Sequence, residues 1–237
     1  MGENKSNQNN SKGPLIATII VAVAAIAAIV ILLITLMPGK ENENSTASLP
    51  DGTQITFRAS QELVDECRDN AHDLVANNFE VIKLFITQGL PHLDEPYGNL
   101  PEDGVYTVNS DKYKTMDDIE NFLKSIYTDD AVKNILDKNV YRSRLTKDGV
   151  PYMGTESDSP NVEKVLGINA SFKADKNYGK DWTSCFVEVT PISETECHIA
   201  VYVNGTNPDD ESIDSASVIE STMVKTDDKW KLSELLS

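Results

Sequence analysis

The chain has 237 residues, with 38 Asp or Glu and 21 Lys or Arg, which gives a formal net charge of −17 at pH 7. An acidic excess of this size disfavours nucleic acid and anionic lipid as partners, and it favours simple solubility or a cationic partner surface. Only three cysteines are present. A disulfide framework is therefore not expected, and a domain of this length can bury a core without one.

The first predicted element is a transmembrane helix over residues 14–37, which follows a polar tail at residues 1–13. The run contains no charged residue, and its helical length of roughly 34 Å matches a hydrocarbon core of about 30 Å. A cleavable signal peptide, the alternative, usually has an apolar region of only about 7–15 residues. Lys5 and Lys12 precede the run. The positive-inside rule therefore places the tail in the cytoplasm and the rest of the chain outside the cell.

Residues 38–56 are rich in Pro, Gly, Asn, Ser and Glu without an apolar period, which predicts a flexible tether. Residues 57–237 then form an extracellular domain. The first 40 residues hold one acidic and three basic side chains, so 37 acidic and 18 basic ones remain, a formal charge of −19. We therefore expect a single-pass protein of the cell membrane with a strongly acidic exterior.

The extracellular domain is predicted to begin with one long amphipathic helix. Ser60 is placed to cap its N-terminus, and the Gly-Leu-Pro sequence at residues 89–91 is placed to end it. A kink, if one occurs, is expected near Asn77-Asn78. Apolar residues recur at helical spacing at Leu63, Cys67, Ala71, Leu74, Val75, Ile82 and Ile86. A loop and a short strand over residues 105–108 follow.

Two shorter helices come next, each with its own start signal. Thr115 and Asp118 form a capping-box-like pair, and Thr128, followed by two aspartates, starts the second helix. Aspartates in both first turns also suit the positive ends of the helices. The apolar residues expected to be buried are Ile119, Phe122, Leu123 and Ile126 in the first, and Ala131, Val132, Ile135 and Leu136 in the second.

From residue 139 onward the apolar period changes from about 3.6 to 2, which predicts strands. Residues 147–149 are a turn signal, residues 165–172 are a candidate strand, and residues 217–225 and 229–235 predict a terminal hairpin. Alternation sends to one buried face Cys185, Val187, Val189, Cys197, Ile199, Val201, Val203, Trp230 and Leu232. The order of elements predicts an α+β domain with a helical N-terminal part packed on a curved antiparallel sheet.

A nucleophilic enzyme needs a thiol or hydroxyl beside a base, and Cys185 or Cys197 with His198 is the pair to consider. Alternation puts both cysteines on the apolar face and His198 on the other. This favours buried structural cysteines over a Cys185–Cys197 disulfide or a catalytic thiol. His72, His92 and His198 stand in no zinc-binding spacing, and no glycine-rich phosphate loop is present. We predict no catalytic residue, no metal and no cofactor, and a protein that is not an enzyme.

Residues 207–214, NPDDESID, concentrate four acidic side chains in a predicted loop. The order of these residues is not that of an EF-hand calcium loop. Three interpretations are open: a solvated turn, a partner-binding loop and a calcium site. The partner-binding loop is the one that bears on function. The candidate partner-binding residues are Asp209, Asp210, Glu211 and Asp214.

Residues 104–136, GVYTVNSDKYKTMDDIENFLKSIYTDDAVKNIL, resemble a known family. The segment is similar to one in the IseA-type inhibitors of bacterial cell-wall DL-endopeptidases, where it lies between a long N-terminal helix and a curved sheet. The matching residues are Tyr106, Lys114, Thr115, Asp118, Ile119, Phe122, Leu123, Tyr127, Thr128 and Ala131. Trp182 after Lys180-Asp181 and the terminal Asp-Asp-Lys-Trp-Lys-Leu pattern are looser points of likeness.

The resemblance implies an NTF2-like or cystatin-like fold and a non-enzymatic function. It implies a protein that docks onto the catalytic cleft of an extracellular NlpC/P60-type cysteine peptidase and restrains cutting of the peptidoglycan. The acidic exterior is compatible with this partner, because charge complementarity speeds encounter and sets specificity. The alternative is an NTF2-like ectodomain without inhibitor activity that binds a small ligand or a neighbouring membrane protein.

Overall fold

A computed structural model describes residues 47–48, 52, 54–93, 103–155, 161–206 and 213–237. The chain divides into two units, residues 1–55 and residues 56–237. In the first unit, β1 (Ala47–Ser48) pairs with β2 (Gln54–Ile55) in an antiparallel ladder within the predicted tether. The predicted transmembrane helix lies outside the described residues. Among the residues described, no helix is long and apolar enough to cross a membrane.

The second unit begins with the long helix α2 (Gln61–Ile82), which continues directly into the π-helical turn η1 (Lys83–Thr87). The predicted cap is confirmed, because the Ser60 hydroxyl accepts a hydrogen bond from the backbone N–H of Leu63 at 3.2 Å. The helix is continuous through Asn77 and Asn78, so the expected position of a kink is wrong. The departure from α-helical geometry comes later, at Lys83, and the segment ends before Gly89, which has a positive φ of 70°.

Helices α3 (Met116–Lys124) and α4 (Asp129–Leu136) confirm the two predicted start signals. Asp118 N–H donates to the Thr115 hydroxyl at 3.3 Å, and the Asp118 carboxylate accepts from Thr115 N–H at 2.8 Å, which completes the capping box. Hydrogen bonds from the backbone N–H groups of Lys114 and Thr115 lower the pKa of Asp118. The carboxylate of Asp118 therefore stabilises the N-terminus of α3.

The first sheet has the strand order β3-β6-β4-β5, with every neighbouring pair antiparallel. Its strands are β3 (Val105–Thr107), β4 (Tyr141–Lys147), β5 (Val150–Pro151) and β6 (Val162–Asn169). The predicted turn between β4 and β5 is confirmed, with positive φ at Asp148 and Gly149. Strand β6 begins and ends three residues before the predicted segment 165–172, because Phe172 N–H turns back to the carbonyl of Asn169.

The second sheet is an antiparallel meander with the order β10-β9-β8-β7. Its strands are β7 (Lys180–Pro191), β8 (Glu196–Thr206), β9 (Ile213–Thr226) and β10 (Lys229–Leu232). The terminal hairpin turns at Asp227 and Asp228, which both have the positive φ that a two-residue hairpin loop requires. The predicted α+β class is confirmed, but two four-stranded sheets replace the single expected sheet, since β3 and β4 pair with β6.

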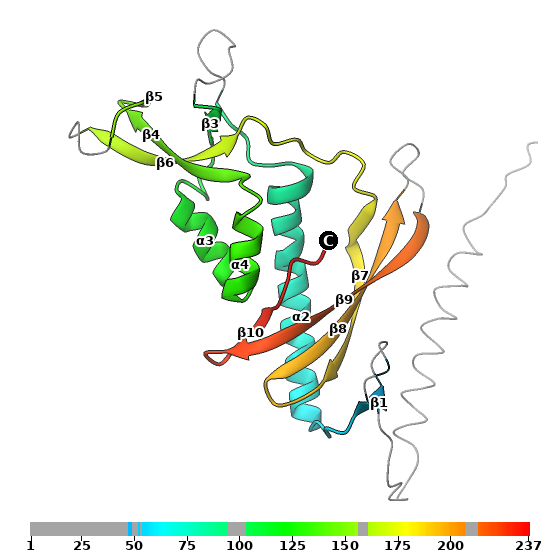
Figure 1. The fold of residues 1–237 in the computed structure, drawn as a ribbon. Helices are drawn as coiled ribbons and strands as arrows, with labels where there is room; N and C mark the ends of the chain where they lie inside the picture. Colours follow the sequence, from blue (N-terminus) through cyan, green and yellow to red (C-terminus); the bar gives the residue numbers. More distant parts are fainter. Residues whose placement is uncertain (1–46, 49–51, 53, 94–102, 156–160, 207–212) are drawn as a thin grey trace, which may run out of the picture. The chain divides into compact units, whose positions relative to one another are not determined.

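Helix α2 packs on one face of the second sheet, here called the inner face, and α3 and α4 lie on the other side of the helix (Figure 1). The inner-face side chains are almost fully buried: Val187, Cys197, Ile199, Val201, Val203, Met223, Trp230 and Leu232. Alternation had assigned all of these except Met223 to the apolar face, and that assignment is confirmed. The domain core therefore lies between α2 and this sheet.

Asn78 fastens the C-terminal residues to this core. Its side chain is fully buried, donates to the carbonyl of Leu236 at 3.0 Å and accepts from the N–H of Leu236 at 3.0 Å. The hydroxyl of Tyr127, at the α3–α4 connection, donates to the same amide oxygen at 2.6 Å. One polar side chain thus joins three segments that are distant in the sequence.

Candidate functional site

The sequence-predicted partner-binding residues fall at the connection between β8 and β9. Asp209, Asp210 and Glu211 lie outside the described residues, and Asp214 lies in β9, with its side chain outside them. The hairpin that carries this connection is described on both sides. Its outer face, opposite α2, carries the candidate site.

Three bulky side chains stand in one row across the outer face of the second sheet. Phe186 of β7 is in register with Tyr202 of β8, and Tyr202 is in register with Val218 of β9. Phe186 is 56% exposed and Val218 is 49% exposed, while Tyr202 is half-buried between them. The rings of Phe186 and Tyr202 are tilted by 45° with centroids 5.9 Å apart. The row is a continuous apolar strip on a solvent-facing surface.

A row with two carboxylates lies directly beside the apolar row. Glu188 of β7 and Glu220 of β9 are both in register with Ala200 of β8, which is itself buried. The Tyr202 hydroxyl donates to Glu188 Oε2 at 2.9 Å. This hydrogen bond, with burial, raises the pKa of Tyr202, so the phenol stays neutral. Across the described part of the chain, no cation forms a salt bridge with Glu188 or Glu220.

This arrangement suits binding more than chemistry. Exposed aromatic rings beside uncompensated carboxylates attract Lys or Arg side chains through charge and through cation–π contact. The sequence prediction missed the row, although alternation along β7 and β8 places Phe186 and Tyr202 opposite the apolar face. Two aromatic residues at polar-face positions are the signal that could have identified it.

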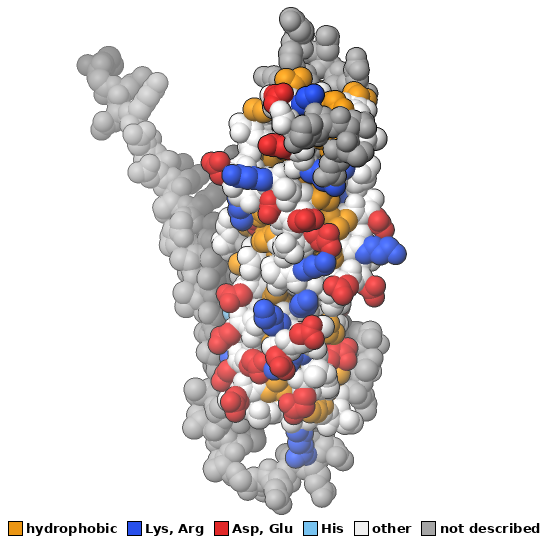
Figure 2. Space-filling model, turned by 90° about the vertical axis from the view of Figure 1, so that its left-hand side faces the viewer, with side chains coloured by type: hydrophobic (Ala, Val, Ile, Leu, Met, Phe, Trp, Pro, Cys, Tyr) orange, Lys and Arg blue, Asp and Glu red, His pale blue; other side chains and the backbone are white. Residues whose placement is uncertain are grey.

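The charge elsewhere on the domain is distributed differently. Figure 2 shows a face on the side of α3 and α4, where acidic side chains are interspersed with basic ones. On α3, Lys124 forms an ion pair with Glu120 at 2.5 Å. A face where charges of both signs are mixed is a weaker candidate for a charged partner than the outer face of the second sheet.

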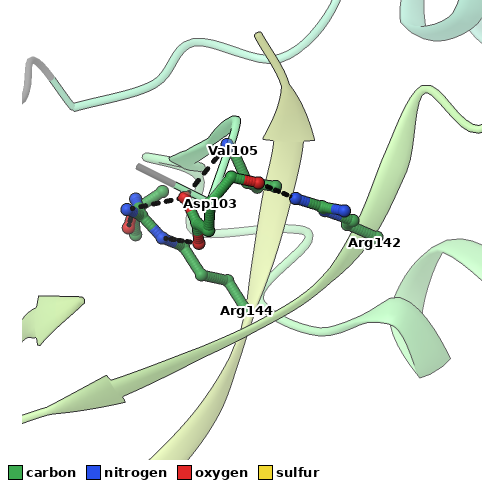
Figure 3. A network of polar contacts seen from close by, with 5 residues as sticks. Asp103, Val105, Arg142 and Arg144 are labelled. Carbon is green, nitrogen blue, oxygen red and sulfur yellow. Dashed lines mark hydrogen bonds and ion pairs between the residues drawn. The ribbon is translucent and has the colours of Figure 1, made fainter. Parts of the chain in front are cut away.

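A second charged cluster, centred on Asp103 and Arg144, joins the strands of the first sheet (Figure 3). The Arg144 side chain is 2% exposed, and its Nε donates to Asp103 Oδ2 at 3.0 Å. The same carboxylate accepts from Val105 N–H at 3.1 Å, and the Asp103 carbonyl accepts from Arg142. Thr107 accepts from Arg144 Nη1 at 2.9 Å. These groups bind one another, so the cluster fastens the chain before β3 and is structural.

The cysteines and histidines do not form a catalytic pair in the structure. Cys197 is fully buried on the inner face, and its Sγ donates to the backbone carbonyl of His198 at 3.4 Å. Burial raises the pKa of Cys185 and of Cys197, which keeps both thiols neutral. Within the described ranges, no group of three or more His, Cys, Asp or Glu side chains is arranged to hold a metal ion.

Two surface hollows flank Phe172 at the end of the first sheet. One, of about 250 Å³, is bordered by Leu90, His92, Tyr106 and Phe172, with the His92 and Tyr106 rings stacked 4.3 Å apart. The other, of about 430 Å³, is bordered by Phe85, Asn139 and Lys173. Ligand sites commonly enclose about 300–1,000 Å³. The first hollow therefore suits only a small flat group against the stacked rings.

No protein-family model matches the chain, and no curated protein matches it.

Proposed function

We propose that this chain is a membrane-anchored extracellular protein that binds a peptidoglycan hydrolase of the DL-endopeptidase, NlpC/P60 type and inhibits or regulates it. The outer face of the second sheet is its proposed contact surface. The observation that carries the proposal is the exposed row of Phe186, Tyr202 and Val218 beside the uncompensated carboxylates of Glu188 and Glu220. The class of partner comes from the resemblance of residues 104–136 to IseA-type inhibitors.

The residues that carry this resemblance act as structure in the present fold. Thr115 and Asp118 form a capping box, Thr128 caps α4, and the side chains of Ile119, Leu123, Tyr127 and Ala131 are buried. They support a shared scaffold, which we assign to the NTF2-like or cystatin-like folds. Most of these side chains pack in the core or cap helices, so we place the contact surface elsewhere on the domain.

In this proposal, the apolar row and the two glutamates dock against a basic and apolar rim of the peptidase cleft. On docking, the apolar row and the apolar part of the rim remove each other's surface from water. The carboxylates of Glu188 and Glu220 meet cationic side chains of the partner. The acidic residues Asp209, Asp210, Glu211 and Asp214 belong to the same hairpin in sequence, and we keep them as candidate partner-binding residues. The anchor proposed at residues 14–37 would confine the inhibitor to the membrane surface.

The test adds the full-length chain, kept soluble in detergent micelles, to peptidoglycan that is being digested by a DL-endopeptidase. We expect slower digestion with increasing chain concentration, measured as loss of turbidity. A muramidase, which cuts the sugar backbone of the same substrate, is the control enzyme and should not be slowed. The proposal fails if several DL-endopeptidases keep their full rate at micromolar chain and calorimetry detects no complex.

The alternative function is an NTF2-like ectodomain that holds a small ligand. The stacked His92 and Tyr106 rings beside the hollow of about 250 Å³ are the observation in its favour. Screening small aromatic compounds by thermal shift tests it, with Tyr106→Ala as the variant that should abolish any stabilisation. A ligand found in this way, together with undiminished digestion in the experiment above, would favour the alternative.

A further inference from the structure

The larger hollow beside Phe172, of about 430 Å³, lies where three segments of the chain meet. Phe85 and Ile86 come from η1, Val140 directly precedes β4, and Phe172 lies in the connection between β6 and β7. The N–H of Asp175 donates to the carbonyl of Ile86 at 2.7 Å, which holds this connection against η1. Ligand sites commonly enclose about 300–1,000 Å³, so the hollow has room for a small organic molecule.

Four of the residues that line this hollow are apolar. Phe85 and Val140 are buried, while Ile86 and Phe172 pack against the core and keep part of their surface free. Gly89 allows the Phe172 ring to take its place, because a Cβ atom at Gly89 would lie only 2.8 Å from that ring. The hollow therefore offers an apolar surface to whatever enters it.

Two lysines and one aspartate give this hollow its charge. Lys138 and Lys173 both border it and are exposed. Across the part of the chain that the structure describes, neither ammonium group forms a salt bridge. Asp175 also borders the hollow, and its carboxylate accepts from the N–H of Asn177 at 2.9 Å. Two ammonium groups against one carboxylate leave one positive charge here, in a chain whose formal net charge is −17.

This combination suits a ligand with one negative charge and an apolar body. The body removes apolar surface of the hollow from water, and a carboxylate beside it is attracted by both Lys138 and Lys173. Asn139 also lines the hollow, and its side-chain amide is a hydrogen-bond donor of the kind that a carboxylate accepts. A phosphate or a dicarboxylate would bring further negative charge, which Asp175 repels.

We propose that this hollow binds small organic acids, with the apolar body against Phe85, Val140 and Phe172 and the carboxylate beside Lys138 and Lys173. The same chemistry occurs in free aryl or alkyl carboxylic acids and at the C-terminal carboxylate of a peptide whose last residue is apolar. Both sources present one carboxylate next to an apolar group.

The proposed site is distinct from the surfaces assigned above. It shares no residue with the outer face of the second sheet, so peptidase binding and acid binding can be measured separately. It is also a different hollow from the one bordered by the stacked His92 and Tyr106 rings, although Phe172 borders both.

The experiment titrates the nitrogen-15-labelled full-length chain, in detergent micelles at low salt, with two acids. These are 3-phenylpropionate, a free organic acid, and N-acetylphenylalanine, which has the carboxylate of a peptide C-terminus. Each is paired with its neutral amide. We expect the backbone amide signals of residues 138–140 and 171–173 to shift with a Kd of about 1 mM for the preferred acid, as for a weak site in an open hollow. The neutral amides should bind at least about tenfold more weakly. The acid that binds more tightly identifies the source.

Three lysine variants test the position of the carboxylate. Lys138→Gln and Lys173→Gln should each weaken binding of the acids by at least about threefold, because each removes one of the two attracting charges. Lys176→Gln is the matched control, since Lys176 is exposed in the same connection but does not line the hollow. It should leave binding unchanged, and substitutions at exposed positions such as these should preserve the fold.

The proposal is overturned if neither acid shifts these signals at about 10 mM, ten times the expected Kd. It is also overturned if the neutral amides bind as tightly as the acids, or if Lys176→Gln weakens binding as much as the other two variants. Binding that Tyr106→Ala abolishes would belong to the hollow beside His92 and would equally overturn it.

Discussion

Val201 and Tyr202 are neighbours in β8, yet their surroundings are opposite. Val201 is 0% exposed and packs with Ile199 and Val203 on the inner face under α2, whereas Tyr202 lies in the outer row between Phe186 and Val218. The same alternation holds in β7 from Cys185 to Val189 and in β9 from Ser217 to Met223. Each strand therefore contributes every second residue to the core and every other residue to a surface in contact with water.

This difference separates stability from recognition within one set of strands. Inner-face side chains contribute through burial, and the cost of altering them is felt by the whole fold. Outer-face side chains contribute little to folding, so they are free to be selected for a partner. Substitutions on the two faces should accordingly change different measurements, and the following predictions are ordered from the largest effect to the smallest.

The largest loss of stability is expected on replacing Asn78, the polar side chain buried in the core. Asn78→Ala removes the partners of three groups at once, the N–H and carbonyl of Leu236 and the hydroxyl of Tyr127. Buried polar groups without partners cost about 1–3 kcal/mol each, so we expect the free energy of unfolding to fall by about 3–5 kcal/mol. Guanidinium-induced unfolding measures this change.

Asn77→Ala is the matched control for that substitution. Asn77 is the neighbouring residue of the same type and is exposed, with a hydrogen bond only to the carbonyl of Asp73 in its own helix. Its replacement should change stability by less than about 0.5 kcal/mol. Equal stabilities of the two variants would show that the C-terminal residues are not held through Asn78.

Two valines compare the faces directly with the same chemical change. Val201→Ala removes two buried methyl groups from the inner face and should cost about 2 kcal/mol. Val218→Ala, at a position that is 49% exposed on the outer face, should cost less than about 0.5 kcal/mol. Thermal unfolding of both variants decides the comparison. Similar losses would mean that the outer face is also covered in the folded protein.

The local parts of this fold were predictable from the sequence, because their causes are local. Ser60, Thr115 and Thr128 cap helices through contacts within three residues, and the hairpin loop at residues 227–228 is set by its own backbone. Strand alternation likewise identified most of the inner face. In each case, the residues that decide the structure lie next to one another in the chain.

The candidate site and the polar core depended on distant partners. Asn77-Asn78 suggested a kink, because the sequence does not show that Leu236 and Tyr127 will meet Asn78. Alternation places Phe186 on the outer face, but only the strand register brings it beside Tyr202. An irregularity between residues 181 and 186 shifts that register, and the sequence pattern does not give its size. The division into two sheets was missed for the same reason.

A binding effect without a stability effect is expected on the outer face. Phe186→Ala should weaken inhibition of the proposed peptidase by at least about tenfold, or ~1.4 kcal/mol, because exposed aromatic side chains commonly anchor interfaces. The inhibition constant of the full chain, measured by peptidoglycan digestion, is the readout. Val150→Ala, at a position 59% exposed on the first sheet, is the control and should leave inhibition unchanged. Equal inhibition by both variants would remove Phe186 from the contact surface.

The smallest predicted effect is a pH dependence of the stability that Glu66 contributes where α2 meets β9 and β10. Hydrogen bonds from Lys225 and Trp230 lower the pKa of Glu66 in the folded state. A carboxylate with a lowered pKa stabilises the fold above its unfolded pKa of about 4.3, and this stabilisation is lost as the pH falls through the folded value. Wild type should therefore exceed Glu66→Gln in Tm by about 2 °C from pH 7 to about pH 5.

That difference in Tm should shrink as the pH falls below about 4, since the protonated Glu66 and its amide substitute then make similar contacts. Glu62→Gln, in the first turn of the same helix, provides the background change for removing one negative charge from α2. A wild-type advantage that persists unchanged to pH 2.5 would mean that Glu66 acts through packing. The charge of Glu66 would then have no part in holding α2 against β9 and β10. The contact between α2 and the second sheet would depend on apolar packing and on Asn78.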